Sequence, residues 1–138
     1  MAELLVALGI SSAVGIMVLV MMVQGLQEIK RRNEQERLHA TATFVVDRLG
    51  FWVKQADVLT VASPGALEAH LPDGTVKRFE LSGVALALDG QPLTDQGITV
   101  TGLTFSLLAR SVRINLSLEA SADSRLSFTT TIAQRNEL

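Results

Sequence analysis

The residues best suited to acid–base or metal chemistry are two histidines, and their surroundings support neither role. His39 and His70 are far apart and have no serine or acid at motif spacing, which nucleophilic and metal sites require. The chain has no cysteine, which excludes a disulfide framework and a thiolate metal site. No strand pattern precedes Gly9 or Gly15, so neither belongs to a phosphate-binding loop. We therefore expect no catalytic residue, cofactor or metal ion, and no enzyme activity.

Glu3 is the ionisable residue in the most unusual setting, because it stands at the start of an unbroken apolar run. Residues 4–23 carry no charge, and this length matches the roughly 20 residues that cross a hydrocarbon core. A carboxylate at the edge of such a span costs several kcal/mol unless it is paired or reaches water. Glu3 therefore either pairs with a cation or lies at headgroup level, where it favours a helix N-terminus.

The apolar run continues into a polar stretch and then an amphipathic one, and we expect a single helix through all three. Residues 24–37 contain no proline, so the helix can continue through them. We predict a helix over residues 1–58, with a membrane or filament-core segment at 1–23 and a polar waist and amphipathic half at 24–58. Apolar residues spaced three and four apart then share one helical face: Leu38, Ala42, Val45, Leu49, Trp52, Ala56 and Leu59.

The remainder, residues 59–138, has the alternation and turn residues of an antiparallel β domain. We expect a turn at Asp73 and a bulge at Gly102, where the apolar phase shifts. The result is an α+β fold in which the long helix packs on a C-terminal antiparallel sheet. The expected strands are residues 67–71, 75–81, 84–88, 98–108, 111–119 and 124–133. The expected helix–sheet core is Leu38, Val45, Leu49, Trp52 and Leu59.

The string Glu3-Leu4-Leu5-Val6-Ala7-Leu8, a long apolar helix, an amphipathic second half and an antiparallel sheet together resemble type IV pilins and type II secretion pseudopilins. The resemblance covers the helical part of the chain well and the β region only in architecture. It implies a structural subunit that polymerises into a helical filament, alone or with other minor pilins. It also implies processing by a prepilin peptidase, residence in the inner membrane before assembly, and then a periplasmic or cell-surface filament.

The same resemblance implies roles for residues of the apolar segment. Glu3 would pair with the free or N-methylated terminal amine of an adjacent subunit, while Leu4, Leu5 and Leu8 would pack in the filament core. Many pilins have a proline inside this helix, and none occurs here before Pro64. Loosening of the helix on assembly would then have to come from Gly9, Ser11, Ser12 and Gly15.

Two other departures bear on the family comparison. The glutamate is usually the fifth residue of a mature pilin, after a phenylalanine start, so Glu3 implies that two residues and a basic leader precede this numbering. The cysteine pair of many major pilins is also missing. This favours a pseudopilin or minor pilin.

Phe44 and Phe51 lie about two turns apart on the helix side away from the apolar stripe. We expect both to contact a neighbouring subunit, although a loop of their own domain could instead cover them.

Charge limits the other functions that need to be considered. The formal net charge of −2 argues against general nucleic-acid binding. Lys30, Arg31 and Arg32 follow the apolar run, and in an ordinary single-span protein they would keep the following region cytoplasmic. The main alternative, from a different functional class, is a single-span, membrane-anchored binding module whose β domain holds a ligand or partner and does not polymerise.

Overall fold

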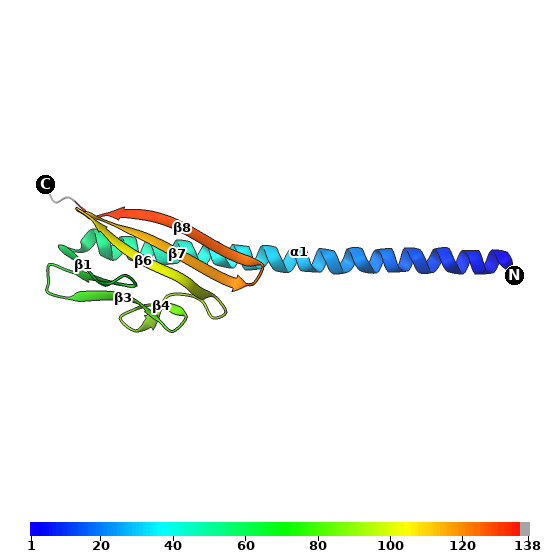
Figure 1. Cartoon of the computed structure of the whole chain (residues 1–138), viewed down its shortest axis with the longest axis horizontal. Helices are drawn as coiled ribbons and strands as arrows, with labels where there is room; N and C mark the ends of the chain where they lie inside the picture. The colour runs from blue at the N-terminus through cyan, green and yellow to red at the C-terminus, as the bar shows by residue number, and fades with distance from the viewer. Residues whose placement is uncertain (136–138) are drawn as a thin grey trace. The chain divides into compact units, whose positions relative to one another are not determined.

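Residues 1–135 are described in the computed structural model, which contains one helix followed by eight strands (Figure 1). This arrangement is an α+β fold with the helix packed against antiparallel strands, as predicted. Helix α1 spans Ala2–Gln55. The strands are β1 Val58–Ser63, β2 Ala66–His70, β3 Val76–Ser82, β4 Ala85–Leu88, β5 Gln91–Pro92, β6 Thr99–Leu108, β7 Ser111–Ser121 and β8 Ser124–Ala133.

The chain divides into two compact units, and α1 contributes to both. The first unit, Met1–Asn33, is helical from Ala2 onward. The second begins at Glu34 and contains the rest of α1 together with the strands. The amphipathic half of the helix is therefore part of the globular unit.

The strands form two antiparallel sheets, whereas the sequence predicts one. The first sheet has the order β1-β2-β3-β4-β5, and the second has the order β6-β7-β8. The first sheet stops at β5, a two-residue strand that ends at Pro92. Proline has no N–H to extend a ladder, so the chain leaves this sheet and starts a new one at β6.

Strand β6 is the place where the two sheets meet. The Val100 N–H donates to the Val84 carbonyl at 2.8 Å, and the Phe105 N–H donates to the Pro64 carbonyl at 2.8 Å. The pairing of β6 with β7 also shifts register between Val100 and Gly102, which confirms the predicted bulge. Two turns of the first sheet therefore occupy the outer edge of β6.

The core of the globular unit lies between the second half of α1 and both sheets. In Figure 1, β6, β7 and β8 run alongside this half of the helix. The alternation in β7 places its apolar side chains on the buried face. The helix contributes Leu38, Ala42, Val45, Leu49 and Val53, and the β5–β6 loop contributes Ile98. The sheets contribute Leu67, Phe79, Leu86, Val100, Phe105, Val112, Ile114, Leu116, Leu118 and Ile132.

Helix α1 ends at Gln55, earlier than the predicted residue 58, and Leu59 lies in β1 instead of the helical stripe. The β-branched residues of this strand favour extended backbone, and Leu59 pairs with Ala69 of β2. The Asp57 N–H donates to the His70 carbonyl at 2.8 Å. Hydrogen bonding to β2 therefore replaces the last predicted helical turn.

The buried stripe of the helix also departs from its expected centre. Val53 is fully buried, whereas Trp52 is only partly buried against the core. Leu38, Val45 and Leu49 are buried. The indole of Trp52 lies on the flank of the stripe.

Two polar contacts join α1 to the connections between strands. The Glu34 carboxylate accepts hydrogen bonds from the Ser121 and Ser124 hydroxyls at 2.7 and 2.9 Å. The Arg37 guanidinium donates to the Gln96 carbonyl at 2.9 Å. These contacts hold the start of the globular unit's helix against the β7–β8 turn and the β5–β6 loop.

We expect Leu49→Ala to lower the free energy of unfolding by about 2–5 kcal/mol, because it leaves a cavity in a fully buried site. Leu107→Ala is the matched control, since Leu107 is exposed on β6, and it should change stability by less than about 0.5 kcal/mol. Denaturant unfolding followed by the fluorescence of the single tryptophan measures both. Equal losses in the two variants would contradict the assigned core.

Candidate assembly surface on helix α1

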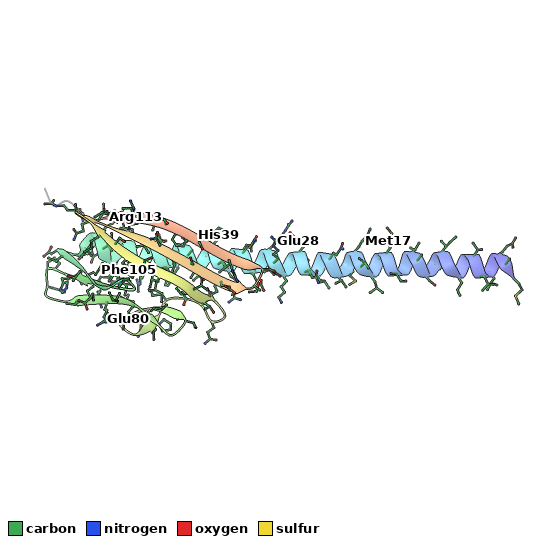
Figure 2. All side chains as sticks on the ribbon, viewed as in Figure 1. Met17, Glu28, His39, Glu80, Phe105 and Arg113 are labelled. Atoms are coloured by element: carbon green, nitrogen blue, oxygen red, sulfur yellow. The ribbon has the colours of Figure 1, made fainter. Side chains whose placement is uncertain are left out.

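The first half of α1 presents apolar side chains that no part of the described chain covers. An 18-residue window of this helix has a mean hydropathy of 2.6 and is 0% buried, so its length and composition are compatible with crossing a membrane. Leu4, Leu5 and Leu8 are each more than half exposed. Met17 projects from the middle of this segment in Figure 2. Such a surface requires an apolar environment.

Glu3 lies in the first turn of α1. No hydrogen bond or ion pair joins its carboxylate to another residue within 1–135. The next charged residue along the helix is Glu28, and the next basic one is Lys30. The helix therefore offers no neighbouring cation on its own side chains.

The predicted loosening positions lie in regular helix in the single chain. Gly9, Ser11, Ser12 and Gly15 all lie inside α1. The Ser12 hydroxyl donates to the Leu8 carbonyl at 2.8 Å, a local bond that competes with the helical ladder. A Cβ added at Gly9 or Gly15 would meet nothing within 4 Å. Loosening on assembly stays a prediction.

Phe44 and Phe51 are 51% and 49% exposed, so no loop of the described chain covers either ring fully. Phe51 makes an edge-to-face contact with Trp52, with ring centroids 5.0 Å apart. Phe44 borders a hollow that Arg48 and Trp52 also line. The two rings thus form an exposed aromatic ridge with Arg48 between them in sequence.

Sequence reasoning missed the polar cluster on the flank of Trp52. The Lys77 ammonium lies 5.0 Å from the Trp52 ring centroid and 3.0 Å from the Asp89 carboxylate. The Trp52 Nε1 is buried and has no hydrogen-bond partner among residues 1–135. A tryptophan on a helical stripe indicates core, and nothing in its spacing shows that β3 brings a lysine onto its ring.

Two aspartates in turns have perturbed acidities. The Thr75 N–H donates to the Asp73 carboxylate at 2.8 Å and lowers the pKa of Asp73, which confirms its role as a turn residue. Burial alone would raise the pKa of Asp89, but hydrogen bonds from the Arg78 N–H and the Lys77 ammonium outweigh it and hold the pKa below 3.8. Both groups are therefore stabilised as carboxylates.

The described residues hold no group of three or more metal-binding side chains. His70 Nε2 lies 3.9 Å from the Glu68 carboxylate, and the His39 carbonyl accepts a hydrogen bond from the Thr43 hydroxyl. The two histidines lie on different elements, His39 on α1 and His70 on β2. The apolar segment and the aromatic ridge are surfaces on which large apolar side chains remain exposed.

We expect Asp89→Asn to lower the melting temperature at neutral pH, because it removes the ion pair with Lys77 while asparagine tolerates the local φ of +51°. A depressed carboxyl pKa stabilises the fold above the unfolded-state pKa, and this contribution disappears as pH falls through the lower folded-state value. The difference between wild type and variant should therefore be full above about pH 5, decrease as pH falls, and vanish in strong acid. Calorimetry across that range measures it; a difference that persists unchanged in strong acid would refute the ionic explanation.

Comparison with known proteins identifies no family for this chain. The scan against family models, the search of curated proteins and the search of solved structures each give no match to this chain.

Proposed function

We propose that this chain is a structural subunit of a type IV pilin-like filament, a pilus or a type II secretion pseudopilus. One observation carries the proposal: an unburied apolar helical segment, with a single ionisable residue at its start, continues directly into the helix that closes the core of a β-rich unit. In the proposed filament the apolar segments of many copies bundle together. A heterologous contact that does not close on itself produces a helical polymer.

Before assembly, the same segment would hold the subunit in the inner membrane. A helix satisfies its own backbone hydrogen bonds in hydrocarbon, so transfer from lipid to a helical bundle only exchanges one apolar environment for another. In this proposal a prepilin peptidase processes the chain, and the filament is periplasmic or lies at the cell surface. Other minor pilins are candidate partners.

Glu3 would set the axial register of the polymer. Its carboxylate has no side-chain partner within 1–135, and an isolated charge in an apolar bundle is costly. The terminal amine of the adjacent subunit is the cation that stacking would bring within reach. Pairing would neutralise both groups and favour one subunit spacing.

The alternative, a single-span anchored module that does not polymerise, rests on Lys30, Arg31 and Arg32. These residues immediately follow the apolar segment, as in proteins that keep this side cytoplasmic. Arg32 is already paired with Glu28 at 3.3 Å in the same helix. An accessibility assay of the globular unit in intact cells separates the two orientations.

We expect Glu3→Ala to reduce incorporation into filaments by roughly a hundredfold to a few thousandfold, since an unpaired member of a buried ion pair costs about 3–5 kcal/mol. The globular unit should remain folded and the helix inserted. Glu3→Asp should partly restore incorporation. Quantifying sheared filaments against the membrane pool measures the effect.

The control for Glu3→Ala is Glu28→Ala. It also removes a carboxylate from α1, but the Glu28 carboxylate already pairs with Arg32 of the same helix. It should leave incorporation close to wild type. If Glu3→Ala incorporates at the wild-type rate with unchanged subunit rise, Glu3 does not pair between subunits.

Phe44 should contribute to contact between subunits. Phe44→Ala removes a half-exposed ring, so we expect unfolding stability to change by less than about 1 kcal/mol while assembly falls several-fold. Phe105→Ala, at a buried ring, should show the opposite pattern, with about 3–5 kcal/mol lost. A Phe44→Ala variant with a lower melting temperature but normal assembly would show that the Phe44 ring stabilises only its own subunit. Phe51 is a less selective probe because its ring also packs on Trp52.

A further inference from the structure

Strand β8 has an open edge. It is the last strand in the order β6-β7-β8, so one side pairs with β7 and the other side has no strand partner in the described chain. Such an edge presents backbone N–H and C=O groups that can pair with another strand. Natural edges are usually protected by proline, charge or a bulge. The stretch from Leu126 to Gln134 has no proline and no charged residue.

The opposite edge of the same sheet, strand β6, is partly covered. The outer side of β6 receives the Val84 and Pro64 carbonyls, which accept hydrogen bonds from Val100 and Phe105. The first sheet thus covers part of the β6 edge. Within residues 1–135, the edge of this sheet that remains available to an additional strand is β8.

A hollow of about 480 Å³ lies between α1 and the end of β8. Gly50 forms part of its helix side, and a Cβ built there would lie 4.0 Å from Ile132 Cδ1, an ordinary van der Waals contact. A second hollow of about 500 Å³ shares Phe51, Lys54 and Ala133 with the first. A strand added to β8 would therefore have apolar space beside it for its side chains.

The far end of this surface is positively charged. Lys54 and Arg135 are the charged residues that line the second hollow. Neither has an ion-pair or hydrogen-bond partner within the described chain. Lys54 also lines the first hollow together with Asp47, and both cations line a third hollow together with Asp57 and Asp73. The second hollow is therefore the one in which the two cations have no carboxylate beside them.

We propose that β8 and these hollows bind an extended segment of a partner protein by strand addition. The partner's backbone pairs with the open edge of β8, and main-chain hydrogen bonds of this kind supply affinity while side-chain pockets supply specificity. An apolar side chain enters the hollow over Gly50 and Ile132. An acidic group of the segment pairs with Lys54 and Arg135. This site is separate from the apolar segment of α1, but it shares Phe51 with the aromatic ridge.

Panning randomised decapeptides against the detergent-solubilised full chain tests the proposal. We expect selected peptides to alternate apolar and polar residues and to carry an acidic residue near one end. A synthetic copy of a selected peptide should slow amide hydrogen exchange in residues 126–133 and leave β6 unchanged. Failure to select such peptides, or protection confined to other strands, would overturn the proposal.

Substitutions in the hollows then test whether the peptide binds at the proposed site. Gly50→Leu fills the hollow and should weaken peptide binding by about tenfold or more, and Lys54→Glu with Arg135→Glu should do the same through charge. Gly25→Leu makes the same substitution elsewhere on α1, where nothing lies within 4 Å, and should bind normally. Unchanged binding by Gly50→Leu would refute the site. If β8 becomes more protected from amide hydrogen exchange as the protein concentration rises, without any peptide, then the edge pairs with a second copy of the chain and the proposal is wrong.

Discussion

The apolar stripe of α1 is the surface on which the globular unit depends. Each sheet has one apolar face, and the buried residues of both faces pack in one cluster with Leu38, Leu49 and Val53 of the helix. Without this helix, side chains such as Phe79 and Ile114 would face water. The strands therefore cannot close a core by themselves, and the helix is an obligatory part of the unit that it carries.

The N-terminal half of the same helix has the opposite requirement, because its apolar side chains need cover from outside the chain. The stripe Leu38, Ala42, Val45, Leu49 and Val53 is buried within the chain, whereas the segment before Val23 leaves its apolar side chains exposed. Because the helical backbone satisfies its own hydrogen bonds, this segment needs only apolar cover, which lipid or other helices can supply. In our proposed function the apolar segments of other copies supply this cover. Glu3 is the one group that discriminates between those environments, since lipid headgroups offer it water and a bundle does not.

Local patterns predict much of this fold. The β7–β8 hairpin, the bulge before Gly102 and the turn at Asp73 follow from alternation, a phase shift and turn chemistry within a few residues. Strand β1 is harder to predict from the sequence, because the spacing of Leu59 also fits a helical stripe. Only its pairing with β2 decides between helix and strand.

Contacts between distant residues are what the sequence does not reveal. Nothing local shows that Lys77 lies over Trp52, that Glu34 accepts hydrogen bonds from Ser121, or that the turns of one sheet meet β6 in another. The exposed apolar segment could be predicted from composition. The open edge of β8 required the strand order, which depends on pairing across the whole unit.

Electron cryomicroscopy of the material assembled in membranes tests the central claim most directly. The account predicts a helical filament in which the apolar segments of α1 form the core, the β-rich units face outward, and each Glu3 lies beside a terminal amine of a neighbouring subunit. Chains that remain single in the bilayer, or a polymer in which the apolar segments do not contact one another, would contradict it.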